Sequence, residues 1–240
     1  MMELLLLIET HNLLNISFNI WGEISMCQIQ MIRDKNSNQN TDLPHMLCDK
    51  DSWENIVSNM GIKNEDKIVI YDNSDVISSC RCWYNFIYFG HNPNLIHVLD
   101  GGLKKWIMEN KTITSNLTLI VRSNYKANEK KNLVKNKLEI NKNISTKEFT
   151  VIDARSKKRF EGEITEPRKG LRSGSIKDSF CLPFSDLIND DRTFIDKEKI
   201  LEKFKSVKCD LNKNLIFSCG SGVTASVLAL AYSLIDNKYM

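Results

Sequence analysis

One segment near the C-terminal end of the sequence contains residue types suited to nucleophilic chemistry, Cys219-Gly220-Ser221-Gly222-Val223-Thr224-Ala225. A strand pattern precedes it and an apolar helix pattern follows, so Cys219 would lie where the unpaired N–H groups of a helix start converge. Those donors and the helix dipole favour a thiolate and can hold an anion attached to it, and the glycines let the backbone curl around one point. The loop therefore predicts a reactive thiol, with a buried structural cysteine as the alternative.

Phosphatases also place a cysteine in a loop between a strand and a helix. That chemistry needs a guanidinium at the far end of the loop to bind three phosphoryl oxygens. Here the loop continues into Ala225 and Ser226, and no arginine follows as far as Met240. A neutral loop suits a small, singly charged adduct such as a persulfide, so phosphatase chemistry is disfavoured.

Two segments of the chain share the same order of elements. Lys67–Tyr71 predicts a buried strand, followed by a polar turn and a helical stretch through Trp83, Phe86 and Phe89. Asn214–Ser218 predicts a second buried strand, followed by the cysteine loop and an apolar helix from Val223 to Ile235. When the two segments are aligned, Asp72 falls on Cys219 and Ser74 on Ser221, which indicates two copies of one α/β unit.

The domain boundaries follow from this duplication. The 240 residues suffice for two small domains, and a Lys- and Asn-rich stretch lies between the two copies. We expect a non-catalytic domain over 1–115 with Asp72 at the cysteine position, a linker leading into the second domain over 116–145, and a catalytic domain over 146–240. The second domain opens with the strand pattern of 149–153. Strands that alternate with helices predict an α/β fold, with a parallel sheet flanked by helices in each domain.

Composition excludes several other classes of protein. The net charge of +3 is too small to indicate a nucleic-acid partner, and no apolar run is long enough to predict a membrane-spanning helix. The seven cysteines are an odd number at irregular spacing, without a zinc-binding pattern. We therefore expect free thiols, a reducing and cytoplasmic location, and no bound metal.

The cysteine loop resembles the active-site loop of 3-mercaptopyruvate sulfurtransferases, which are two-domain members of the rhodanese superfamily. Thiosulfate-specific relatives resemble it less, because they carry basic residues directly after the cysteine. The resemblance covers roughly residues 43 to 240 and implies two tandem rhodanese-like domains. Its further motifs are Leu43-Pro44-His45-Met46-Leu47, Val69-Ile70-Tyr71-Asp72, Phe89-Gly90-His91, Val98-Leu99-Asp100-Gly101-Gly102, Asp153-Ala154-Arg155, Arg159-Phe160-Glu161-Gly162, Glu166-Pro167-Arg168 and Ser173-Gly174.

The resemblance also implies roles for individual residues. Arg159 and Arg168 match two arginines that bind the substrate carboxylate and keto group, as guanidinium groups are suited to do. His45 matches a histidine that lines the active-site cleft, and Ser221 could bind the substrate carbonyl or relay a proton. Gly220, Gly222, Val223 and Thr224 complete the active-site loop. Without the resemblance, the arginines would be interpreted as surface residues, His45 as structural and Ser221 as a turn former.

The family pattern is incomplete at both ends of the sequence. About the first 30 residues do not match it, and the last residue, Met240, follows closely on the active-site helix. We therefore expect an N-terminally degenerate first domain, and a second domain that lacks its last strand and helix.

These features together predict a sulfurtransferase. Cys219 would take sulfur from 3-mercaptopyruvate, release pyruvate, and pass the persulfide sulfur to cyanide or to a thiol acceptor such as thioredoxin. No organic cofactor, nucleic acid or membrane is expected to take part. The alternatives are a thiosulfate sulfurtransferase and a degenerate relative that is catalytically weak or dead.

Overall fold

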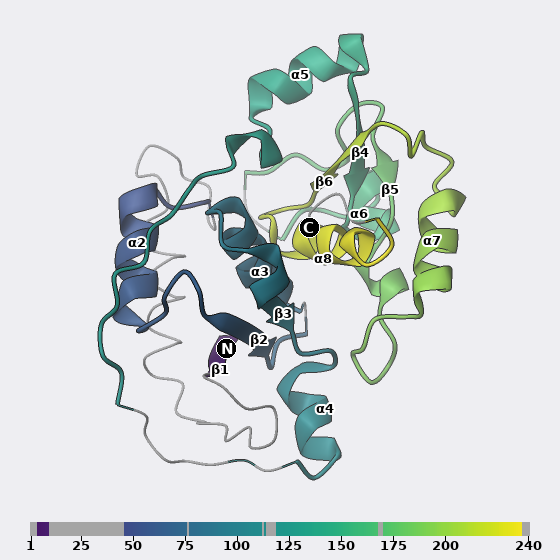
Figure 1. Cartoon of the computed structure of the whole chain (residues 1–240). Helices are drawn as coiled ribbons and strands as arrows, with labels where there is room; N and C mark the ends of the chain where they lie inside the picture. Colours follow the sequence, from purple (N-terminus) through teal and green to yellow (C-terminus); the bar gives the residue numbers. More distant parts are fainter. Residues whose placement is uncertain are drawn as a thin grey trace.

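The computed structural model describes residues 4–9, 46–75, 77–111, 113, 119–167 and 170–236, which form two α/β units (Figure 1). The elements of the first unit are β1 (Leu4–Glu9), α2 (Lys50–Asn59), β2 (Lys67–Asp72), α3 (Ser79–Tyr88), the 3-10 turn η1 (Pro93–Leu95), β3 (Ile96–Val98) and α4 (Gly102–Met108). Those that follow are η2 (Lys131–Leu133), α5 (Lys137–Thr146), β4 (Phe149–Asp153), α6 (Lys157–Glu161), β5 (Phe180–Cys181), η3 (Phe184–Leu187), α7 (Lys197–Ser206), β6 (Asn214–Ser218) and α8 (Val223–Ser233).

The second sheet has the strand order β5-β4-β6, and both pairings are parallel. The register pairs Asp153 with Ser218, the last residues of β4 and β6. The chain segments that follow these two strands therefore leave the sheet at the same edge. This topology brings the Cys219 loop close to the segment after β4, which leads into α6.

The first sheet has the order β1-β2-β3, and β3 runs parallel to β2. The α/β architecture of parallel strands flanked by helices is confirmed, with one difference. β1 pairs antiparallel with β2, from Leu4 opposite Asp72 to Glu9 opposite Lys67, so this sheet is mixed. A continuous apolar run is typical of a parallel strand, so the antiparallel pairing of β1 departs from this pattern.

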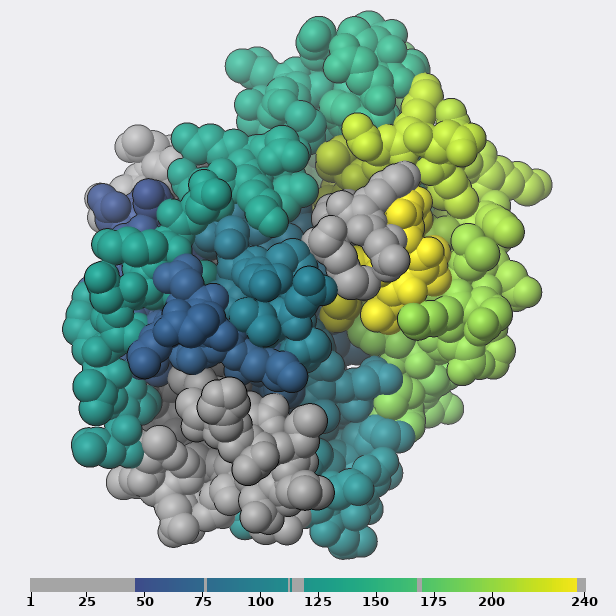
Figure 2. Space-filling model, in the orientation of Figure 1, coloured from purple at the N-terminus to yellow at the C-terminus, as the bar shows by residue number. Residues whose placement is uncertain are grey.

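Helix α8 is apolar on all sides because it lies between two hydrophobic cores. Val227, Ala229 and Leu230 pack in the core of the first unit, whereas Leu228 and Ala231 pack in the core of the second. On the other side of this boundary lies α3, which packs against α8 at the centre of the molecule (Figure 1). The two helices that follow the equivalent loops, α3 and α8, therefore form the contact between the units. Figure 2 shows the two units in contact on one face of the molecule.

Part of the predicted linker packs on the first unit. The segment 119–130 runs past α2 along the outside of that unit (Figure 1), and Ser123 N–H donates to the Ser58 carbonyl at 2.9 Å. Tyr125 is fully buried in the first core, where its hydroxyl lies 3.2 Å from Nδ1 of His91. Among the described residues, no helix is long and apolar enough to cross a bilayer.

Candidate active site

Cys219 lies on the short loop between β6 and α8. The backbone N–H of Gly222 donates to Cys219 Sγ at 3.0 Å. Gly222 has a φ of +81°, in the left-handed region that favours glycine. The Ser226 hydroxyl donates to the Gly222 carbonyl at 2.7 Å, which fastens the loop to the first turn of the helix. An amide donor and the positive end of the α8 dipole thus lie at the sulfur atom, as predicted for a reactive thiol.

The other predicted loop residues surround this cysteine. Gly220 is exposed and Ser221 is half-buried, both on the loop itself. Val223 and Thr224, also half-buried, form the start of α8. The predicted order of strand, loop and helix is confirmed, and the chemical roles of these residues stay predictions.

Arg159 lies next to the loop. Its Nη2 is 3.2 Å from the position that a Cβ on Gly220 would occupy, so a larger residue there would press on the guanidinium. Glu166 accepts from Arg159 at 3.1 Å (Nε to Oε1) and 2.5 Å (Nη2 to Oε2). The Arg159 guanidinium lowers the pKa of the Glu166 carboxyl. This bidentate pair fixes the direction of the Arg159 side chain.

Glu166 is itself held by a second guanidinium. Arg155 donates to Glu166 Oε1 at 2.8 Å and to the Gly174 carbonyl at 2.9 Å. Asp153, at the end of β4, accepts from Arg155 at 2.6 Å and raises the pKa of that guanidinium. The Asp153 and Glu166 carboxylates are each only 3% exposed. The rigid strand β4 thus orients Arg159 through Arg155 and Glu166, a role for Glu166 that the sequence analysis did not assign.

The structure adds one further guanidinium to the loop, from the other unit. Arg81 lies on α3, and its Nη1 is 2.6 Å from the position that a Cβ on Gly222 would occupy. Burial lowers the pKa of the Arg81 guanidinium, and the negative charge of Cys219 acts in the opposite direction. The loop residues themselves carry no charge, but the fold brings two guanidinium groups to them from other elements, Arg81 beside Gly222 and Arg159 beside Gly220. The available signal was an arginine between two cysteines in an otherwise apolar helix.

Two predicted substrate-binding residues, His45 and Arg168, lie outside the described residues. Their positions in the site stay predictions. In the part of the chain that the structure describes, no group of three His, Cys, Asp or Glu side chains is suited to hold a metal ion.

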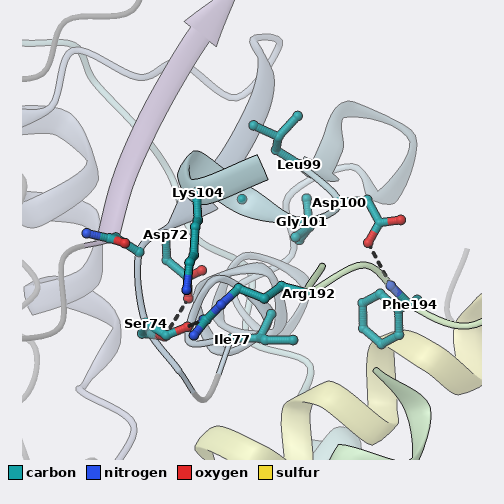
Figure 3. Close-up of a pocket in the computed structure, with 12 residues that line it drawn as sticks. Asp72, Ser74, Ile77, Leu99, Asp100, Gly101, Lys104, Arg192 and Phe194 are labelled. Carbon is teal, nitrogen blue, oxygen red and sulfur yellow. Dashed lines mark hydrogen bonds between the residues drawn. The ribbon is translucent and has the colours of Figure 1, made fainter. Parts of the chain in front are cut away.

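The equivalent loop of the first unit carries Asp72 at the end of β2. Its Oδ2 accepts from the hydroxyls of Ser74 and Ser78 and from the Ser79 N–H, each at 2.8 Å. Figure 3 shows the small pocket beside it, over which Arg192 of the second unit donates to the Ser74 carbonyl at 2.5 Å. The pocket holds ≈ 10 Å³, room for about one water molecule. This loop is filled by its own carboxylate and has no space for a substrate.

A larger cavity of ≈ 570 Å³ lies between α3, β6 and α8. Its walls include Arg81 and Tyr84 from the first unit, and Gly222, Ala225 and Ser226 from the loop and α8. Its size falls within the range of small-molecule sites. The Gly222 side of the loop therefore borders a cavity with a cationic group in its wall.

The chain is similar to known proteins of the rhodanese type in both sequence and fold. A family model, the rhodanese-like domain, matches residues 18–109, so the resemblance begins nearer the N-terminus than the predicted residue 43. Thiosulfate/3-mercaptopyruvate sulfurtransferase 1 of Arabidopsis thaliana is 33% identical over 215 residues, which cover 81% of this chain and 56% of that protein. Thiosulfate sulfurtransferase of Bos taurus is 33% identical over 210 residues, covering 86% of this chain and 69% of that protein.

Among solved structures, this chain is similar to the 3-mercaptopyruvate sulfotransferase SseA from Escherichia coli. The TM-score is 0.74 at 24% identity, covering 85% of this chain and 75% of that chain. The two-domain fold is therefore confirmed. The chain spans little more than half of the length of the Arabidopsis protein.

Proposed function

Since this chain belongs to the rhodanese family, we propose that it is a sulfurtransferase that moves sulfur from 3-mercaptopyruvate to a thiol or to cyanide through a persulfide on Cys219. The observation that carries the proposal is the Gly222 N–H at 3.0 Å from Cys219 Sγ, at the start of α8. This donor favours a thiolate before the reaction and an anionic persulfide after it. The Arg159 guanidinium beside Gly220 supplies a group for the substrate carboxylate.

The proposed reaction has two steps. The Cys219 thiolate attacks the sulfur atom of 3-mercaptopyruvate, a sulfur–sulfur bond forms and the carbon–sulfur bond breaks. The electron pair of the broken bond passes to carbon as the enolate of pyruvate, which takes up a proton. An acceptor thiolate then attacks the outer sulfur, and the Cys219 thiolate leaves.

Three other residues belong to the proposal. Arg168 would share the substrate carboxylate and keto group with Arg159, His45 would line the cleft, and Ser221 would bind the substrate carbonyl or relay a proton. The six described cysteines are free thiols, in agreement with a reducing environment in which thioredoxin or another thiol serves as acceptor.

Thiosulfate is the second candidate donor, because the relatives include enzymes named for each donor. The residues directly after the cysteine, Gly220 and Ser221, are uncharged where thiosulfate-specific relatives carry basic residues, and this favours 3-mercaptopyruvate. Cyanolysis measured after loading with each donor compares the two activities directly. Faster turnover with thiosulfate would reverse the assignment, and no turnover with either donor would indicate a degenerate relative.

Cys219→Ser tests the nucleophile, with Cys181→Ser as the matched control. Cys181 is also half-buried, but burial raises the pKa of its thiol to about 11. We expect Cys219→Ser to abolish turnover while Cys181→Ser retains it, because a serine hydroxyl cannot form a persulfide. Mass spectrometry after donor loading should find one added sulfur on the peptide that contains Cys219. Its presence on another cysteine would overturn the assignment.

A further inference from the structure

Arg81 is placed at the boundary between the two units. It lies in the first turn of α3, between the buried Cys80 and Cys82, and it is half-buried itself. Because α3 packs along α8 (Figure 1), the long Arg81 side chain reaches the loop that precedes α8. A residue of the domain without the cysteine is thereby brought to the domain that carries it.

Gly222 connects Arg81 to the reactive sulfur. Its N–H points to Cys219 Sγ, and the side of its α-carbon where a Cβ would stand faces Arg81 Nη1. The position of such a Cβ is 2.6 Å from Nη1, closer than real Cβ atoms come to another heavy atom, so the guanidinium lies directly against the glycine backbone. Arg81 packs against one side of Gly222 and Ser226 binds its carbonyl, so both residues limit how far the amide donor can turn.

Charge couples the same groups. The titratable groups around the loop are Arg81 from α3, Arg159 from α6 and Glu166, which is paired with Arg159. Cys48 and Tyr84 lie near Arg81 within the first unit. The charge of Cys219 acts on Arg81, and in general a positive charge close to a thiol favours its charged form. The half-buried setting strengthens this attraction relative to bulk water.

We propose that Arg81 is a positioning residue of the first domain that holds the Cys219 loop and stabilises negative charge on the Cys219 sulfur. The inference deepens the proposed function and rests on it, since it assigns the first domain a part in preparing the nucleophile. The active site is then incomplete without the first domain.

Arg192 provides a contrast, because it crosses the boundary in the opposite direction. It donates to the Ser74 carbonyl and forms an ion pair with the exposed Asp75. These contacts join the two units at the rim of the first-domain loop. Arg81, in contrast, lies against the glycine that donates to the reactive sulfur.

The test measures the thiol itself, without any sulfur transfer. We would compare the wild-type chain with Arg81→Met, Arg81→Gln and Arg81→Lys, and with Arg122→Met as the control. Arg122 is an exposed arginine of the first unit that binds Asn55 and Asn59. The rate of iodoacetamide alkylation is followed from pH 5 to pH 10 by mass spectrometry of the Cys219 peptide, and circular dichroism melting checks each fold.

We expect Arg81→Met and Arg81→Gln to raise the pH midpoint of Cys219 alkylation by about one unit, which means about tenfold less thiolate below the midpoint. Arg81→Lys should restore part of the shift, and Arg122→Met should match the wild type. An unchanged midpoint in a folded neutral variant would overturn the inference. Should Arg81→Met fail to fold, Arg81→Gln decides. A shifted midpoint in a chain that transfers no sulfur would uphold the charge effect and refute the proposed function.

Discussion

Gly222→Ala probes the geometry of the loop most directly. Alanine at a φ of +81° occupies the left-handed region at a cost of about 1–2 kcal/mol. Its Cβ would also stand 2.6 Å from Arg81 Nη1, so the end of this long side chain must move away, which adds a cost of at most about 3 kcal/mol. For a chain of this size, each kcal/mol lowers the melting temperature by about 2–4 °C. We therefore expect the melting temperature of Gly222→Ala to fall by roughly 2–20 °C, and by more than the backbone cost alone.

Gly170→Ala is a matched control for the backbone cost alone. Gly170 has a φ of +86°, and a Cβ there would meet no atom of the residues that the structure describes within 4 Å. Its melting temperature should fall by only about 2–8 °C. The double variant Gly222→Ala/Arg81→Ala should recover part of the loss, because the truncated Arg81 leaves room for the new methyl group. Equal losses in the two glycine variants, with additive effects in the double variant, would refute the close contact between Arg81 and Gly222.

Two further variants test Glu166 beside the candidate site and the buried His91 of the first unit. Glu166→Gln removes the charge that binds both Arg155 and Arg159. We therefore expect the free energy of unfolding to decrease by about 3–5 kcal/mol, and the melting temperature to fall further than for Arg159→Met. Equal melting curves would contradict the shared role of Glu166. Burial lowers the pKa of His91, so below about pH 6.5 the unfolded chain binds more protons than the folded one. The free energy of unfolding therefore decreases as the pH falls below that value, because protonation of His91 favours the unfolded chain. Between pH 7.5 and 5, the melting temperature should fall more steeply for the wild type than for His91→Gln. Parallel pH profiles would show that His91 protonation has little effect.

The elements that carry the site could be predicted from the sequence because their signals are local. An apolar run with charged residues before it and the glycine-containing loop after it predicted β6, which has the expected bounds of 214–218. The cysteine loop and α8 follow it as predicted. No strand was predicted at 4–9, so β1 and its antiparallel pairing with β2 are seen only in the folded chain. Tyr125 lies in a Lys- and Asn-rich stretch, so only the folded chain shows that it belongs to the first core.

The contacts between side chains were less predictable. Arg159 was assigned to the site through resemblance, and the structure places it beside Gly220. Glu166 and Arg81 received no role, because their importance depends on which groups the fold brings to them. Arg81 is far from the loop in sequence, and only the packing of α3 against α8 connects them.

The two equivalent loops differ in the group that stands at the end of the strand, a carboxylate in the first unit and a thiol in the second. In the first loop, the Asp72 carboxylate takes the hydrogen bonds of two hydroxyls and one backbone N–H, so an anion is built into the protein. In the second, a backbone N–H faces the sulfur of Cys219, the atom proposed to carry the transferred sulfur. Both loops accommodate negative charge, and the one beside Asp72 has no room for a ligand. The first unit instead contacts the second, because α3 and α8 share one hydrophobic core and Arg81 lies against Gly222 of the Cys219 loop.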